Sequence, residues 1–303
     1  MSKTIKFLVI CLFAVSAHAA DTLRIIVPFA AGGNTDLAAR VYARELTEQN
    51  INVVVINRPG AEGIIGTQEL MNSKPDGNTL LFTGNSAIVY GAITNPVARD
   101  ALNKIVPIMQ ASIYGQMLVA RNDSDIKTFE QLRNALKTRT VAIASSGVTS
   151  RSSLEELFPN NDNLIIINVP GDSGALLSLA NKSVEVATVT AIIEDRIASG
   201  EFVGLATISQ HSRGNVKSLV EQGYPVYRNG WSGFFAPPGT PLDIRDKLYL
   251  MLERVRQSAI VQQQIHNIVR ATIAPKRTPE QFVRLINDDF NKASVEESRR
   301  LLK

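Results

Sequence analysis

Short apolar runs alternate with amphipathic stretches along most of this chain. The runs have the length of strands and end at turn-forming residues, and they predict strands at residues 23–29, 51–56, 79–83, 140–144, 164–168, 184–189, 203–208 and 233–236. The stretches between them have helical apolar spacing, most clearly after residue 33 and at 63–72, 129–137, 243–258 and 279–292. Strands that alternate with helices indicate an α/β fold with largely parallel sheets. A second strand–turn–helix unit begins near Thr140, which indicates a second lobe.

Residues 1–19 have the order of features typical of a secretory signal peptide. Lys3 and Lys6 form a positive start, residues 7–15 (FLVICLFAV) are apolar, and Ala17-His18-Ala19 is an A-x-A cleavage motif. The apolar run is too short to span a bilayer, and no later stretch approaches the roughly 18 apolar residues of a membrane helix. A buried N-terminal strand or helix is the alternative. We expect cleavage near Ala19 and export of residues 20–303.

Composition and charge narrow the classes of function. The chain has 303 residues, 45% of them hydrophobic and 20% charged, and one cysteine, so it is not disordered, collagen-like or rich in disulfides. Its formal charge of +4 gives no reason to expect nucleic acid as a partner, which would require a clustered basic face. Loss of residues 1–19 removes two lysines and the cysteine, which leaves 30 basic against 28 acidic residues, or +2. The exported chain is therefore nearly neutral and free of cysteine.

A search for catalytic and metal-binding motifs finds none. His211 and His266 are far apart in the sequence and lack metal-ligand spacing, and the exported chain has no cysteine to bind zinc. The P-loop, the G-x-G-x-x-G fingerprint and the G-x-S-x-G elbow are absent. We therefore expect no catalytic residue, no metal and no cofactor. Two alternatives stay open, a pair of carboxylates brought together by folding and an exported hydrolase that uses Ser146 or Ser86.

Two loops rich in glycine and hydroxyl groups are the most informative features. The loop at 29–36 (FAAGGNTD) and the loop at 145–150 (SSGVTS) each follow a predicted strand and precede a predicted helix. Backbone N–H groups at a helix N-terminus are unpaired and carry partial positive charge, so they bind a carboxylate without an arginine. The alternative is that each loop is only a tight turn with a helix cap. Two such loops in two lobes of an exported α/β protein favour a cleft that binds an anion.

The first loop belongs to a longer segment at 25–40 (IIVPFAAGGNTDLAAR). This segment closely resembles the opening of the tripartite tricarboxylate transporter receptors, the TctC-like or Bug family. Further segments resemble that family in the same order, at 54–63 (VVINRPGAEG), 74–81 (KPDGNTLL), 145–150, 169–170 (VP) and 233–241 (GFFAPPGTP). The resemblance thus covers essentially the whole exported chain.

The resemblance implies a periplasmic binding protein with two lobes. Its fold would be α/β and type II-like, a Venus flytrap in which each lobe is a mainly parallel sheet flanked by helices. Residues 20–119 and 229–303 would form domain 1, and residues 120–228 would form domain 2. The domains would close on a small carboxylate, either a dicarboxylate or tricarboxylate, an amino acid or an aromatic acid. A monomer would deliver it to the permease subunits of a tripartite tricarboxylate transporter, or act as an orphan sensor for a membrane kinase.

The resemblance also assigns ligand-binding roles to two walls of a pocket. The first wall comprises Phe29, Ala31, Gly32, Gly33, Thr35 and Asp36, with Ser86 nearby; the second comprises Ser145, Ser146, Gly147, Thr149 and Ser150, with Gly171, Ser173 and Thr190 at its edge. Asp36 is expected to order its loop rather than face the anion, because like charges repel. The chain departs from the family pattern at Thr149, Gly171 and Val189, so a ligand other than a tricarboxylate is an open expectation.

Overall fold

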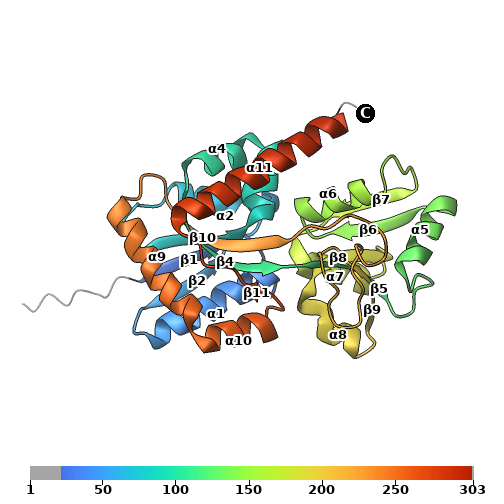
Figure 1. The fold of residues 1–303 in the computed structure, drawn as a ribbon, viewed down its shortest axis with the longest axis horizontal. Helices are drawn as coiled ribbons and strands as arrows, with labels where there is room; N and C mark the ends of the chain where they lie inside the picture. The colour runs from blue at the N-terminus through green and yellow to red at the C-terminus, as the bar shows by residue number, and fades with distance from the viewer. Residues whose placement is uncertain (1–21, 302–303) are drawn as a thin grey trace, which may run out of the picture.

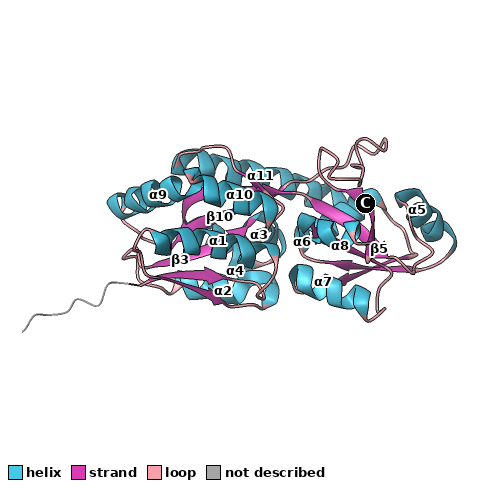
Figure 2. Cartoon of the chain, turned by 90° about the horizontal axis from the view of Figure 1, so that it is seen from below, coloured by secondary structure: helices cyan, strands magenta, loops and turns pink. Residues whose placement is uncertain are grey.

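The chain folds into two lobes that lie side by side, each built around one sheet (Figures 1 and 2). The structure, a computed structural model, describes residues 22–301, so the signal peptide expected at 1–19 lies outside the described residues. None of the described helices combines the length and the apolar character needed to cross a membrane. The two-lobed α/β architecture expected from the sequence is confirmed.

The first lobe holds a six-stranded sheet with the strand order β11-β4-β10-β3-β1-β2. Its strands are β1 (Leu23–Val27), β2 (Val53–Asn57), β3 (Thr79–Gly84), β4 (Val106–Tyr114), β10 (Gly230–Ala236) and β11 (Thr272–Ile273). Its helical segments are α1 (Asn34–Glu48), η1 (Ala61–Gly63), α2 (Ile64–Met71), η2 (Ser86–Tyr90), α3 (Gly91–Thr94), α4 (Pro96–Lys104), α9 (Leu242–Gln257), α10 (Ala259–Asn267) and α11 (Pro279–Leu301).

Strand β1 shows how the sequence pattern produces the layers of this lobe. Ile25 and Val27 belong to a core that includes side chains of α1, α9 and α10, whereas Ile26 belongs to a core that includes α2, α4 and α11. Successive side chains of a strand point to opposite faces, so a fully apolar run requires helices on both faces of the sheet. The apolar run that starts at Ile25 therefore indicates a central strand.

The second lobe holds a five-stranded sheet with the strand order β7-β6-β8-β5-β9. Its strands are β5 (Gln116–Arg121), β6 (Val141–Ser145), β7 (Leu164–Asn168), β8 (Val186–Thr190) and β9 (Phe202–Thr207). Its helical segments are α5 (Phe129–Thr138), α6 (Val148–Leu157), α7 (Gly171–Ala180), η3 (Ala191–Ile193) and α8 (Glu194–Ala198). Leu118 packs with α5 and α6 on one face, and Met117 packs with α7 on the other.

Two connections join the lobes. The chain passes from the first sheet to the second at Gly115, between β4 and β5, and returns between β9 and β10 (Figure 1). Strand β10 pairs antiparallel with β3 and β4, and β5 pairs antiparallel with β8 and β9. Most strands of each sheet therefore run in one direction, as expected, while β10 and β11 run against the others in the first sheet and β5 runs against the others in the second. The alternation of apolar runs does not encode strand direction, and it did not predict β4, β5 or β11.

The parallel strands direct their carboxyl ends toward the opposite lobe. The loops that follow β1 and β6 lie at these ends, and so do the last residues of β3 and β8. In open α/β sheets, ligands bind in the crevice outside the carboxyl ends of the strands. The fold thus brings the two loops singled out in the sequence to the same place between the lobes.

Candidate functional site

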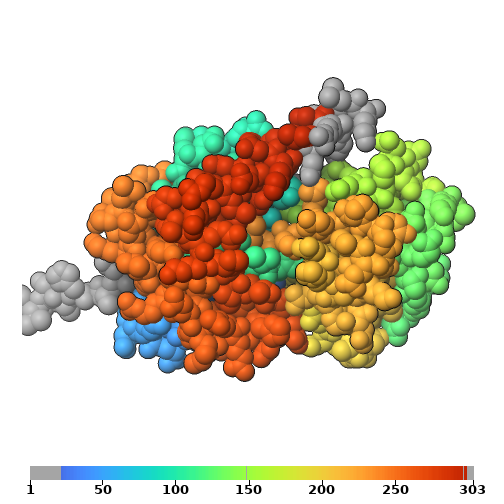
Figure 3. Space-filling view, in the orientation of Figure 1, coloured from blue at the N-terminus to red at the C-terminus, as the bar shows by residue number. Residues whose placement is uncertain are grey.

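A cavity of about 60 Å³ lies between the two lobes, at the seam of the space-filling view (Figure 3). Its lining residues come from both lobes: Phe29, Ala30, Gly33, Asn34, Thr35, Gly84, Ser86, Tyr114, Gln116, Ser146, Pro170, Gly171, Asp172, Ser173 and Thr190. A site of this volume holds roughly four to six water-sized groups. It therefore has room for one carboxylate group and a few further atoms in the present arrangement of the lobes.

The first wall of the cavity is the loop between β1 and α1, and Asp36 holds its shape. The Asp36 carboxylate accepts hydrogen bonds from the Gly32 N–H at 2.9 Å, the Asn57 amide at 2.9 Å and Arg40 Nε at 2.9 Å. Burial alone would raise the pKa of Asp36, but the hydrogen bonds from Arg40, Gly32 and Asn57 outweigh it and lower the pKa below its usual value. Asp36 does not line the cavity, and its hydrogen bonds connect the loop to α1 and β2.

Asn57 completes this wall, although the sequence did not single it out. Its side-chain amide also donates to the Phe29 carbonyl at 3.0 Å, and Arg40 donates to its oxygen at 3.0 Å. Asn34, at the first position of α1, donates to the carbonyl of Val269 at 2.9 Å and so ties the loop to the segment after α10. These contacts fix both ends of the loop against neighbouring elements.

The second wall is the loop between β6 and α6, and its hydroxyl groups mostly satisfy one another. Ser145 donates to the Gly147 carbonyl at 2.9 Å, and the Ser146 and Ser150 hydroxyls lie 3.2 Å apart. The Ser146 N–H donates to Thr188 Oγ1 at 3.2 Å, which anchors the loop to β8. Ser146 alone of the three serines lines the cavity.

The helices beside the cavity start without side-chain caps. Gly33 precedes α1, Gly147 precedes α6 and Pro170 precedes α7, and none of these residues donates or accepts a capping hydrogen bond through a side chain. In α1 the Asn34 N–H interacts with the Asp172 carboxyl group, and the other first-turn N–H groups are left for another partner. This finding weakens the interpretation of the two loops as ordinary capped turns.

The predicted site residues divide into two groups. Those that line the cavity are Phe29, Gly33, Thr35, Ser86, Ser146, Gly171, Ser173 and Thr190. Those outside its lining are Ala31, Gly32, Asp36, Ser145, Gly147, Thr149 and Ser150. Ala31 and Gly32 are exposed, and Thr149 is buried with a hydroxyl that has no hydrogen-bond partner among the described residues. Ligand binding by either group stays a prediction.

Several lining residues were not singled out from the sequence. They are Ala30, Asn34, Gly84, Tyr114, Gln116, Pro170 and Asp172. Asn34 belongs to the loop at 29–36, and Asp172 directly follows the predicted site residue Gly171, so both lie in segments that the sequence had indicated. Tyr114 and Gln116 flank the crossover at Gly115, in a segment for which the apolar pattern predicted no strand.

The serine hydrolase alternative gains no support from the geometry. Within residues 22–301, no hydrogen bond joins Ser86 or Ser146 to an imidazole; the hydroxyl of Ser146 faces that of Ser150 instead. No group of three or more potential metal ligands occurs among the described side chains. A Ser–His pair of the hydrolase type therefore has no counterpart in this part of the chain.

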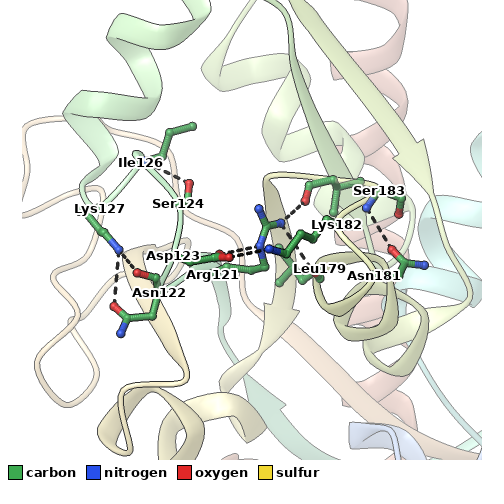
Figure 4. Close-up of polar contacts among 11 residues, drawn as sticks. Arg121, Asn122, Asp123, Ser124, Ile126, Lys127, Leu179, Asn181, Lys182 and Ser183 are labelled. Carbon is green, nitrogen blue, oxygen red and sulfur yellow. Dashed lines mark hydrogen bonds and ion pairs between the residues drawn. The ribbon is translucent and has the colours of Figure 1, made fainter.

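A second hollow lies at the end of β5 opposite from the cavity, and Figure 4 shows its polar contacts. Lys182 and Arg121 each contact the Asp123 carboxylate at 2.8 Å and lower the pKa of Asp123 to about 2. Arg121 also donates to the Val184 carbonyl at 2.8 Å. Both cations are thus engaged with groups of the protein, so we assign this hollow a structural role.

Sequence comparisons give matches over most of the chain. The family model described as the tripartite tricarboxylate transporter family receptor matches residues 38–295. A UPF0065 protein of Bordetella pertussis is 30% identical over an alignment of 315 positions, gaps included, which covers 96% of this chain and 94% of that relative. The protein BugT of the same organism is 31% identical over 276 residues, which cover 86% of this chain and 82% of BugT.

Solved structures share the two-lobed fold. The periplasmic binding protein BugD has a TM-score of 0.83 at 23% identity, with 92% of this chain and 97% of that chain covered. MatC from Rhodopseudomonas palustris, solved with bound malate, has a TM-score of 0.82 at 21% identity, with coverage of 91% and 98%. At these identities the likeness establishes the fold, which is that of two-domain periplasmic binding proteins.

Proposed function

Because the chain belongs to the tripartite tricarboxylate transporter receptor family, whose members are solute-binding receptors rather than enzymes, we propose that it captures a small carboxylate between its lobes. It delivers this ligand to the permease subunits of a tripartite tricarboxylate transporter. The mature chain works in the periplasm, after loss of the signal peptide expected at 1–19. The family match confirms the resemblance stated from the sequence.

The observation that carries this proposal is the cavity at the uncapped N-terminus of α1. The first hydrogen bond of the helix runs from the Leu37 N–H to the Gly33 carbonyl, so the N–H groups before Leu37 lack helical partners. They carry the positive end of the helix dipole, and the Thr35 and Ser86 hydroxyls stand beside them in the cavity lining. Such a site favours an anion, and the malate bound to MatC is one example of a carboxylate in this fold.

Calorimetric titration of residues 20–303 tests the proposal. The panel comprises small monocarboxylates, dicarboxylates, tricarboxylates, amino acids and aromatic acids, with thermal unfolding as a second measurement. We expect at least one acid to bind and to raise the unfolding temperature, because a ligand that binds only the folded state stabilises it. A panel in which no acid binds overturns the proposed function.

Two variants of helix α1 make this test specific to the cavity. Thr35→Val keeps the shape of a cavity-lining side chain but removes its hydroxyl, and we expect about tenfold weaker binding, equivalent to one lost hydrogen bond. Thr47→Val is the matched control, because Thr47 lies on the same helix but is exposed near its other end. Equal affinities of the two variants would place the ligand elsewhere.

A further inference from the structure

The cavity contains an acidic side chain that belongs to the protein. Asp172, near the start of α7, lines the cavity and is only 5% exposed. Its carboxylate accepts hydrogen bonds from the Thr190 N–H at 3.1 Å and the Thr190 hydroxyl at 2.5 Å. No lysine, arginine or histidine is among the residues that line the cavity, and in the described part of the chain Asp172 takes part in no ion pair.

Burial of a carboxylate without a nearby cation lowers the stability of the folded protein. Burial raises the pKa of Asp172, even though hydrogen bonds from Thr190, Ser146 and the Asn34 N–H act in the opposite direction. Buried charges in proteins are usually paired or bind a metal. A cationic ligand group in the cavity would therefore stabilise the Asp172 carboxylate, because no cationic side chain of the described residues lines the cavity.

A second acceptor in the same cavity is unsatisfied. Gln116, the first residue of β5, lines the cavity and is 6% exposed. Its amide nitrogen donates to the Ser150 hydroxyl at 2.7 Å, but its oxygen Oε1 is buried without a hydrogen-bond partner among the described residues. An unmade hydrogen bond at a buried group costs more than an ordinary hydrogen bond contributes. Within one small cavity, Gln116 Oε1 thus lacks a donor and the Asp172 carboxyl group lacks a cation among the described residues.

We propose that Asp172 and Gln116 bind a protonated amine of the ligand, so that this receptor selects amino carboxylates over dicarboxylates and tricarboxylates. The assignment rests on the proposed function, because it gives the ligand carboxylate to the α1 end of the cavity. An ammonium group supplies three donors and the missing positive charge. A second ligand carboxylate at the position of the amine would lie beside Asp172 with no cation between them, and the two like charges would repel each other.

Matched pairs of acids that differ by one amine test this assignment on residues 20–303. The pairs are β-alanine and propionate, L-aspartate and succinate, and L-glutamate and glutarate, with affinities from calorimetry. For at least one pair, we expect the amino member to bind at least tenfold tighter. Asp172→Asn should reduce that ratio at least tenfold, whereas Asp162→Asn, an exposed acid of the same lobe, should leave it unchanged.

The outcomes separate the two proposals. Equal or tighter binding of the amine-free member in every pair that binds, or an unchanged ratio in Asp172→Asn, overturns the amine assignment and leaves the carboxylate receptor standing. Absence of binding by all six acids and by the wider panel overturns the receptor function, and the amine assignment with it. Should Asp172→Asn fail to fold, the ratios of the wild-type chain decide alone.

Discussion

Ser86 of the first lobe lies against Gly147 of the second, so closely that a Cβ atom on Gly147 would be 2.8 Å from Ser86 Oγ. Real Cβ atoms essentially never approach a heavy atom to this distance. Gly147 has a φ of 162°, an extended conformation that any residue adopts. The steric restriction at this position therefore comes from the Ser86 side chain of the opposite lobe and not from the backbone of Gly147.

This contact predicts that Gly147→Ala hinders closure of the lobes. The added methyl group must displace Ser86 or push the lobes apart, so we expect about tenfold weaker ligand binding with little change in the unfolding temperature of the free protein. Gly147→Ala should weaken binding less in a Ser86→Gly background than in the wild-type chain, because the opposing side chain is then absent. Calorimetry on the acid that binds best measures the loss in each background, and an equal loss in both would contradict the steric explanation.

The hydrogen bonds of Asp36 predict a loss of stability when its carboxylate is removed. Asp36→Ala leaves the Gly32 N–H, the Asn57 amide and Arg40 without their acceptor, so we expect a loss of about 2–3 kcal/mol in the free energy of unfolding. Urea unfolding measures this loss, with Asp76→Ala as an exposed control.

The same residue predicts a pH dependence with a defined sign. The pKa of Asp36 in the folded protein lies below its value of 3.8 in the unfolded chain, so its contribution is fully present above pH 3.8. The contribution is lost as the pH falls through the lowered pKa. The wild-type and Asp36→Ala proteins should therefore converge in stability only at strongly acidic pH, and convergence at neutral pH would argue against this carboxylate network.

An ion pair across the lobes predicts a salt-dependent contribution to closure. Arg270, between α10 and β11, contacts Asp195 of α8 at 2.5 Å, and this contact lowers the pKa of Asp195. Asp195→Asn removes the pair without altering the backbone at Arg270, and we expect weaker ligand binding at low salt. Because the Asp195 side chain is exposed, the difference should vanish at high salt.

A pair within one lobe provides the control for this prediction. Asp243 and Lys247 form an ion pair within α9 at 3.1 Å, which closure does not affect. Asp243→Asn should therefore bind ligand like the wild-type protein at every salt concentration. An equal effect of Asp195→Asn and Asp243→Asn would show that the Arg270 contact does not stabilise the closed form.

The burial of Asp172 predicts that Asp172→Asn stabilises the protein without ligand at neutral pH. The pKa of Asp172 is raised above 3.8 in the folded protein, so the charge destabilises the fold increasingly as the pH rises through that raised value. Below pH 3.8 the group is protonated in both states and the difference disappears. Thermal unfolding from pH 4 to pH 8 should show a gap that widens with pH, whereas a less stable variant at pH 8 would contradict this account.

The sequence by itself determined the central strands and the first wall of the site. The strand at 23–27 was predictable because the apolar run that starts at Ile25 must be covered on both faces. The role of Asp36 was predictable as well, because Gly32 and Arg40 each lie four residues from it along the chain. Interactions of this kind are set by local geometry, which the order of residues specifies.

Only the tertiary structure decided which side chains reach the space between the lobes. Gln116 and Asp172 are 56 positions apart, and they meet in one cavity because β5 and α7 belong to the same lobe and face the other. Ser145 and Ser150 have the residue type expected for a ligand site, yet their hydroxyls bond to neighbours within their own lobe. A hydroxyl or carboxylate can bond to many partners, and the packing of the two lobes, which no local pattern contains, selects among them.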